Sequence, residues 1–499
     1  MKKKFGKFDR NYIILIIFLT FPFIDVINSI LITNQYNLIS LGVIAKGFFI
    51  LYLLYDIFLK NKNNESKKTI LIYFSILNIF YIFFIISRIE NLNLNNILNE
   101  TIYTIKYFYY GVATILLFFY IKNNNTKEEI LKKTLYYSAI TYTMLLLIPF
   151  ILNISYASYK YGLNTGTVGL FYSANEVGVI MILLINYFIY NLFHQKGQNK
   201  IINYILLILM TFVSLEIGTK VALFGTFTIY IFHLFLIIST KNMKKIGRYL
   251  LLAILFGTIV FNSSAYINSQ NLMNDIEINK PTLGQENEED TDKVENTDKV
   301  EDTDKVENTD KVEDTDKVED TDKVENTDKV EDTDKAEDTD NEEKYEMLKE
   351  CEFNYFASKI LSDRDDLFCD IYIPYKESSF NNKLLGVGFT NIEKYDNHNI
   401  AKMIEMDFFD LFFRFGILGF IIFMIIPIII IKKCICSIIK NKKVDLFQLT
   451  NIFSLGLSIG ISFLVGHVIS APAVTIYLVL YSILLIFPQK NKEKGKGVK

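Results

Sequence analysis

The sequence lacks several residue types, and these absences narrow the class of protein. It contains no Trp and only four His and four Cys, and charged residues make up 21% of its 499 residues. Four Cys in a chain of this length exclude a scaffold built on disulfides. The His and Cys residues do not stand at the spacings of a zinc site, so we expect no metal cofactor. No G-x-x-x-x-G-K-S/T motif occurs, which argues against ATP hydrolysis through a P-loop.

Apolar residues are abundant. They make up 51% of the chain, with 42 Phe and 31 Tyr, and the mean hydropathy is +0.25. This composition argues against a soluble enzyme, a disordered protein and a nucleic-acid-binding protein, and it indicates a membrane protein. The richness in Ile, Asn and Lys is typical of an AT-rich bacterial genome.

Acidic residues are concentrated in one segment. Residues 286–343 contain 28 Asp or Glu and eight Lys, which leaves the rest of the chain with a net charge of +17. Residues 290–337 are eight copies of a six-residue unit, Asp/Asn-Thr-Asp-Lys-Val/Ala-Glu, and a degenerate ninth copy ends at Glu343. One small apolar residue per unit cannot offset the chain entropy, so we expect this insert to be disordered. An alternative is that its carboxylates hold Ca²⁺ or repel an anionic polymer.

The apolar segments predict an all-α polytopic integral membrane protein. A bilayer core takes about 20 apolar residues per helix, and about twelve such segments occur. The predicted spans are 12–33, 39–59, 69–87, 101–121, 134–153, 176–193, 202–217, 220–239, 249–265, 416–433, 447–467 and 470–488.

This span pattern divides the chain into four parts. They are an N-terminal membrane bundle over 1–265, a large loop over 266–415, C-terminal membrane helices over 416–489 and a basic tail over 490–499.

Positive charge predicts the orientation. The two tails and five short loops on one side hold 29 Lys or Arg, whereas the short loops on the other side hold only Arg88, Lys160 and Lys220. Positive residues favour the cytoplasmic side. We therefore expect both termini in the cytoplasm of a bacterial cell and the large loop outside the plasma membrane.

Several ionisable or polar residues fall in or beside the spans, where they are costly and often functional. Asp25 and Lys46 lie in the first two spans and can pair. Lys220 stands at a tight outer turn, where it can meet a phosphate or anchor the helix at the interface. Asn175 and Glu176 follow Gly169-Leu170-Phe171-Tyr172. This set can stack on and hydrogen-bond a sugar, or Asn175 can simply cap the next helix.

The large loop holds a second set of candidates. Arg364 stands among carboxylates, a pattern that suits bidentate phosphate binding or a local ion pair. Cys351 and Cys369 share this loop and could form a disulfide in an oxidising compartment. His398 lies seven residues before Glu405.

The sequence from Ile404 to Gly419 ends the large loop and predicts an amphipathic helix at the membrane surface, over about 400–415. Asp407, Asp410 and Arg414 share one polar face, and Glu405 lies on the opposite, aromatic side. A carboxylate in such surroundings can act as a general base. The alternative is an Asp410–Arg414 salt bridge with a structural Glu405.

These motifs resemble those of the bacterial O-antigen ligase and polysaccharide polymerase superfamily, whose members are polytopic proteins with one large late extracytoplasmic loop. A Gly-x-Phe-x-x-x-Asn-like stretch of that family is similar to residues 169–175. A Thr-Ser-Arg-like turn has its counterpart in residues 218–220, with Lys in place of Arg. A Gly-Arg-like element before a Gly-x-Gly resembles residues 362–364 and 386–388.

One position departs from the family's pattern. A His-Asn-containing helix of the family normally runs into Gly-Ile-x-Gly. Here residues 416–419 match that motif, but Glu405 falls at the place of the His, and His398-Asn399 is displaced upstream.

The resemblance implies a membrane glycosyltransferase. Such an enzyme moves a glycan from undecaprenyl pyrophosphate to an acceptor hydroxyl at the outer face, with inversion and without a nucleotide, metal or other cofactor. The implied partners are the lipid-linked donor, a glycan or lipid-linked acceptor and the bilayer, with no nucleic acid. A polymerase is favoured over a ligase, because an AT-rich Gram-positive source would lack lipid A.

The resemblance and the chemistry together suggest a role for each candidate residue. Lys220 and Arg364 would stabilise the charge of the pyrophosphate, and Glu405 or Asp407 would supply the base. The candidate substrate-binding residues are Asn175, Glu176, His398, Asp410 and Arg414.

A transporter, such as a flippase for lipid-linked oligosaccharides, is the alternative function. Twelve spans are common in that class as well. Transporters usually show two similar halves with broken helices, whereas here nine predicted spans precede the large loop and three follow it.

Overall fold

The computed structural model describes most of the chain outside the acidic insert. Residues Met1–Ile276 and Cys351–Lys499 form one unit, and Glu277–Glu350 form a second. The hexapeptide repeat and His398 lie outside the described residues. The described ranges are 11–34, 40–61, 63–88, 94–159, 163–195, 201–278, 351, 358–359, 361, 364–390, 403–442, 444–464 and 466–487.

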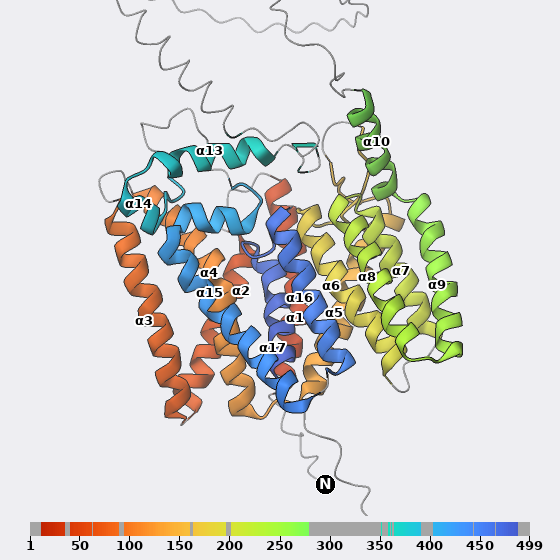
Figure 1. Ribbon diagram of the computed structural model, residues 1–499, viewed down its shortest axis with the longest axis horizontal. Helices are drawn as coiled ribbons and strands as arrows, with labels where there is room; N and C mark the ends of the chain where they lie inside the picture. The colour runs from red at the N-terminus through yellow and green to blue at the C-terminus, as the bar shows by residue number, and fades with distance from the viewer. Residues whose placement is uncertain are drawn as a thin grey trace, which may run out of the picture. The chain divides into compact units, whose positions relative to one another are not determined.

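The described residues form helices, turns and two isolated β-bridges (Figure 1). The helices are α1 (Asn11–Thr33), α2 (Leu41–Tyr55), the π-helix η1 (Asp56–Lys60), α3 (Asn64–Ile86), α4 (Leu94–Asn124), α5 (Glu128–Ile151), α6 (Ala174–His194), α7 (Ile201–Glu216), α8 (Lys220–Ser239), α9 (Met243–Phe261), α10 (Ser264–Ile278), α13 (Arg364–Glu377), α14 (Phe380–Leu385), α15 (Asp407–Asn441), α16 (Leu446–Leu464) and α17 (Pro472–Ile486).

The prediction of an all-helical membrane protein is confirmed. Among the described residues, nine helices are long and apolar enough to span a bilayer. The count is ten if α9 and α10, which meet at a 56° bend, are one span. The helices α7 and α17 are apolar but shorter. Each of the twelve predicted spans coincides with a helix, and the number twelve itself stays a prediction.

Helix α6 lies at the centre of the bundle. Every residue from Val177 to Phe193 is buried, and the helix packs against α5, α7, α8, α16 and α17. A helix that is apolar on all sides is stable only when it is surrounded. The first turn of α6 is therefore held firmly, which fixes the position of Glu176 on that turn.

The predicted tight turn between α7 and α8 is confirmed. Only three residues separate the helices, and Gly218 has φ of +81°. A Cβ atom there would lie 2.3 Å from the carbonyl oxygen of Thr165, so glycine is required. The hydroxyl of Thr219 accepts a hydrogen bond from the amide of Ala222 at 3.2 Å and caps α8. Lys220 is the first residue of that helix.

The amphipathic helix begins later than the sequence predicts. It starts at Asp407, and Glu405 precedes it with φ of +62°. The carbonyl of Glu405 accepts a hydrogen bond from the amide of Gly466 at 2.7 Å. This pairing with a distant segment keeps residues 403–406 out of the helix, so the predicted placement of Glu405 on a helix face was wrong. Gly416, with φ of +64° and ψ of −171°, then breaks α15 where the predicted span begins.

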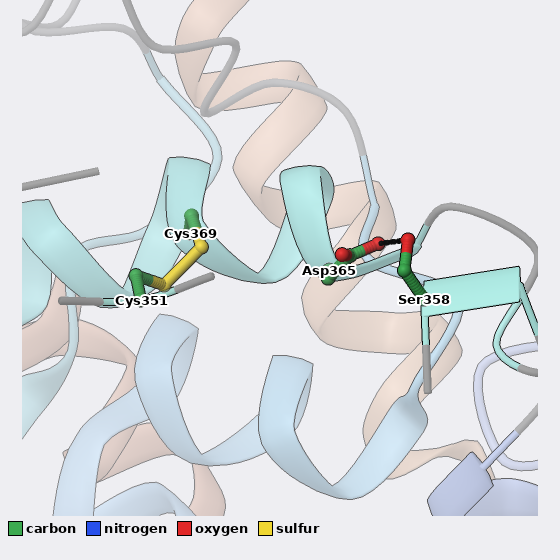
Figure 2. The surroundings of a disulfide bond; sticks show 4 residues. All are labelled: Cys351, Ser358, Asp365 and Cys369. Carbon is green, nitrogen blue, oxygen red and sulfur yellow. Dashed lines mark hydrogen bonds between the residues drawn. A yellow bond between two sulfur atoms is a disulfide. The ribbon is translucent and has the colours of Figure 1, made fainter. Parts of the chain in front are cut away.

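Helix α13 lies across one end of the bundle, and α14 follows it (Figure 1). A disulfide joins Cys351 to Cys369 of α13, which confirms the pairing considered from the sequence. The Ser358 hydroxyl donates to the Asp365 carboxylate at 2.9 Å (Figure 2). These two bonds attach Cys351 and Ser358 to α13, whose first residue is Arg364.

Candidate functional site

A cavity of about 340 Å³ lies where α6 and α17 begin and α1 ends. Its wall includes five ionisable side chains that come from four helices and one loop. Hydrogen-bonding and aromatic groups, among them Tyr142, Tyr172 and Ser470, complete the lining. A concave site with convergent polar groups is the usual form of a ligand-binding site. The five ionisable residues are Asp25, Lys46, Lys106, Glu176 and His467.

Two of these side chains form the ion pair expected from the sequence. The ammonium of Lys46 lies 2.6 Å from Oδ1 of Asp25. Lys106 projects over the ring of Tyr103, with Nζ 4.9 Å from the ring centroid. The wall of the cavity therefore contains two lysine ammonium groups. That of Lys46 is paired with the Asp25 carboxylate at hydrogen-bond distance.

Asn175 does not cap α6. The helix begins at Ala174 with Ser173 in the capping position, so Asn175 lies inside the first turn and its expected capping role was wrong. The side chain of Asn175 instead lies beside Gly466. A Cβ atom added at Gly466 would lie 3.6 Å from the Cβ of Asn175. Asn175 thus stands beside the α16–α17 loop, while Glu176 lines the cavity.

Arg364 and Glu405 form an ion pair at the start of α13. Nη2 of Arg364 donates to Oε2 of Glu405 at 2.6 Å, and Nη1 donates to the carbonyl of Leu361 at 2.7 Å. The Nε atom of Arg364 is buried and has no hydrogen-bond partner among the described residues. A buried donor without a partner is uncommon in folded proteins and calls for an explanation, such as a ligand.

Asp407 holds the loop between α16 and α17. Its carboxylate is fully buried and accepts hydrogen bonds from the amides of Val468 and Ile469, both at 2.6 Å. The hydroxyl of Ser470 donates to it at 2.6 Å and that of Ser462 at 3.2 Å. Four donors occupy this carboxylate, so its environment is that of an anchor for the loop.

His467 is the residue of this site that sequence reasoning missed. It lies in the α16–α17 loop, with Nε2 3.9 Å from Oε1 of Glu405 and Nδ1 3.9 Å from Oδ1 of Asp407. Its Nδ1 is 3.1 Å from the hydroxyl of Ser470. The available signal was a single His at the outer end of a predicted span. Nothing in the sequence shows that residues 405 and 467 meet.

Burial alone would lower the pKa of His467. The hydrogen bond and charge of Asp407, together with the charges of Glu405 and Glu176, outweigh burial and raise this pKa above its ordinary value.

Asp410 and Arg414 form a separate buried pair. The Arg414 Nε donates to Oδ1 of Asp410 at 2.5 Å, and the hydroxyl of Tyr107 donates to Oδ2. Arg414 also donates to the carbonyl of Gly388 at 3.0 Å and lies over the ring of Phe389. The Asp410–Arg414 salt bridge considered from the sequence is thus present, and Arg414 also holds the segment Gly386-Val387-Gly388.

Lys220 contacts a residue that precedes α13 in the sequence. The ammonium of Lys220 donates to the carbonyl of Lys359 at 2.9 Å. Lys359 lies five residues before Arg364 in the sequence. The structure therefore brings Arg364, Glu405, Asp407 and His467 together, with Glu176 on the wall of the adjoining cavity. Lys220 contacts this region only through its bond to Lys359 among the contacts given above, and the buried Asp410–Arg414 pair lies outside the group.

Nine described helices that are long and apolar enough to span a bilayer define a multi-pass membrane protein. The chain matches the model of the O-antigen ligase like membrane protein family over residues 6–491, and it therefore belongs to this family. The resemblance inferred from the motifs is confirmed. The family suggests a membrane enzyme of the glycosyltransferase kind that acts on lipid-linked glycans. No curated protein and no solved structure matches the chain.

Proposed function

We propose that this protein transfers a glycan from undecaprenyl pyrophosphate to an acceptor hydroxyl at the outer face of the bacterial plasma membrane. Family membership supports the reaction class. The observation that carries the proposal is the contact of His467, which lines the cavity, with the Arg364–Glu405 pair. A proton acceptor thus lines a space that a sugar could enter, and a cation lies behind it.

The leaving group sets the main electrostatic demand. Cleavage of the bond between the sugar and the pyrophosphate leaves negative charge on phosphate oxygens, and fixed cations stabilise that charge. Arg364 suits this role because its Nε donor is buried and unpaired among the described groups. Lys220 supports the same segment through its bond to Lys359.

The expected topology fits this assignment. The positive-inside pattern places the large loop outside the cell. Arg364, Glu405 and the start of α6 would then face the side where a lipid-linked glycan is used after it has crossed the membrane. Both termini would be cytoplasmic.

We favour a polymerase over a ligase, and one measurement separates them. The test is a gel profile of surface polysaccharide and lipid-linked intermediates from a strain that lacks the protein. Single repeat units that accumulate without long chains would support the polymerase. Long chains left on the lipid carrier would support the ligase instead. Lipid-linked units retained on the inner leaflet would replace both assignments with a flippase.

Arg364→Ala and Lys220→Ala test the role of the two cations. We expect both variants to insert into the membrane and to lose long surface polysaccharide, because one removes the cation that would stabilise the leaving pyrophosphate and the other removes the contact of Lys220 with Lys359. Lys383→Ala, in α14, is the control and should keep the wild-type profile. A normal chain-length profile in both site variants would refute the cation assignment.

A further inference from the structure

The acceptor hydroxyl must lose a proton as the new glycosidic bond forms, and the site offers three side chains that could take it. They are Glu405, Asp407 and His467. The three side chains have different hydrogen-bond partners, and these partners determine which side chain has a lone pair that can accept the proton.

Asp407 is not available. Its side chain has no exposed area, and two backbone amides and two hydroxyls donate to its oxygens. Proton transfer to Asp407 would break the bonds that hold the α16–α17 loop, and an acceptor sugar could not reach it.

Glu405 is held as a partner of Arg364. One carboxylate oxygen lies 2.6 Å from the guanidinium, and protonation of the carboxylate would remove this pairing. The backbone of Glu405 also has φ of +62°, a conformation that is unusual outside glycine and that fixes the direction of the side chain. Glu405 is therefore placed to hold the cation and to face His467.

The contacts of His467 determine which of its two ring nitrogens carries the proton and which keeps a lone pair. The single hydroxyl proton of Ser470 is donated to Asp407, because a carboxylate only accepts. The contact between Nδ1 of His467 and the Ser470 oxygen then requires that Nδ1 carries the ring proton. Nε2 of the neutral ring keeps its lone pair, and it lies on the side of Glu405.

We propose that His467 is the general base of the transfer reaction, positioned by Ser470 and Asp407, in a role that rests on the function proposed above. The acceptor oxygen attacks the anomeric carbon and its O–H proton passes to Nε2 of His467. The bond from the anomeric carbon to the pyrophosphate oxygen breaks, and the electron pair leaves with the pyrophosphate. The imidazolium then returns its proton to water.

The charges around the ring favour this step. Glu405 and Asp407 face the two ring nitrogens, and Glu176 of α6 lines the same cavity. Asp25, Lys46 and Lys106 are the other charged groups of that wall. The carboxylates that face His467 stabilise the imidazolium that forms as the proton arrives.

The decisive test is chemical rescue of His467→Ala. Purified protein would be given lipid-linked glycan extracted from cells that lack this protein, and turnover would be measured with and without added imidazole. We expect turnover to fall about 100-fold or more and imidazole to restore part of it. Binding of undecaprenyl pyrophosphate alone should be unchanged, since Arg364 and Glu405 remain.

His194→Ala is the matched control, because this histidine lies at the opposite end of α6. It should keep wild-type turnover and show no response to imidazole. Ser470→Ala supplies a second test if His467→Ala does not fold. It should lower kcat with little change in KM, because it removes the group that fixes the ring proton.

The outcomes separate this inference from the proposed function. Unchanged turnover in His467→Ala or in Ser470→Ala would overturn the role of His467 and leave glycan transfer standing. So would a loss in His467→Ala that imidazole does not restore although undecaprenyl pyrophosphate still binds. A wild-type protein that transfers no glycan from the extracted donor would overturn the function itself.

Discussion

At the scale of single residues, three carboxylates within six positions have three different environments. Glu405 is half-buried and pairs with Arg364, whereas Asp407 is saturated with donors from the α16–α17 loop. Asp410 is buried against Arg414 and Tyr107. The same functional group therefore holds a cation, anchors a loop or supports the core, according to its partners.

Arg414→Met tests the structural role of the buried pair. It would leave the Asp410 carboxylate buried without its cation, which typically costs about 3–5 kcal/mol. We expect a large fall in the apparent Tm of the detergent-solubilised protein. Lys133→Met is the control, because the Lys133–Glu129 pair is solvent-exposed and its loss should change the Tm little. Equal effects of the two substitutions would contradict this assignment.

The raised pKa of His467 predicts the pH dependence of transfer. A general base works in its neutral form, so turnover should fall as the pH drops through the pKa of His467, which lies above the ordinary value. Glu405→Gln removes one of the negative charges that raise this pKa. It should therefore move the acidic limb of the pH–rate profile to lower pH. A limb that stays in place in this variant would show that another group titrates.

At the scale of elements, α15 changes direction at a single glycine. Gly416 and Gly386 both have positive φ, and their backbones lie against each other. A Cβ at Gly416 would lie 2.4 Å from the amide nitrogen of Gly386. The close approach lets the first part of α15 lie beside α13 and α14 while the rest enters the bundle (Figure 1).

Gly416→Ala is expected to destabilise the protein. The Gly416 backbone, with φ of +64° and ψ of −171°, lies in a region that essentially only glycine adopts and that costs another residue about 1–3 kcal/mol, and the clash with the Gly386 backbone adds to it. Gly460→Ala in α16 is the matched control, since no heavy atom lies within 4 Å of its added Cβ. Alanine favours a helix interior over glycine, so the control should keep or raise the apparent Tm. A neutral Gly416→Ala would contradict the required break.

The sequence predicted most of the helices and several residues of the site, because these features depend on local sequence patterns. Apolar runs marked the helices, Gly218 marked a turn, and the predicted boundary between residues 415 and 416 coincides with the break at Gly416. The backbone of Glu405 and the approach of His467 depend on a hydrogen bond to Gly466, about sixty residues away. Helical periodicity contains no information about such a pairing, so the helix start was placed too early and His467 was missed.

At the scale of the whole molecule, the four cysteines form two groups, one disulfide-bonded at α13 and one free in α15. Cys351 and Cys369 are joined at the end of the bundle where α13 lies. Cys434 is buried and Cys436 is exposed near the other end of α15. A disulfide in the large loop is consistent with an oxidising extracytoplasmic compartment.

Thiol labelling in intact cells tests the predicted orientation. A membrane-impermeant maleimide should label the protein only after reduction, and then at Cys351 and Cys369. Cys436 should react only with a permeant maleimide. Labelling of Cys436 by the impermeant reagent before reduction would reverse the proposed topology. The Cys351→Ser/Cys369→Ser double variant serves as the control for site assignment.

Deletion of residues 290–343 should leave transfer intact. All residues assigned to the site lie outside this segment; they are Glu176, Lys220, Arg364, Glu405, Asp407 and His467. The measurement is surface polysaccharide length at matched protein levels. Loss of long chains would show that the insert takes part in the reaction.

The disulfide at Cys351 also has a consequence for the history of the gene. It anchors the chain to α13 only eight residues after the last repeat unit, and the bond from Lys220 to Lys359 adds a second anchor. Units gained or lost in frame during DNA replication would then leave Arg364 where it is. We expect natural isolates to differ in copy number while they retain the same surface polymer, a comparison that needs only sequencing and serotyping.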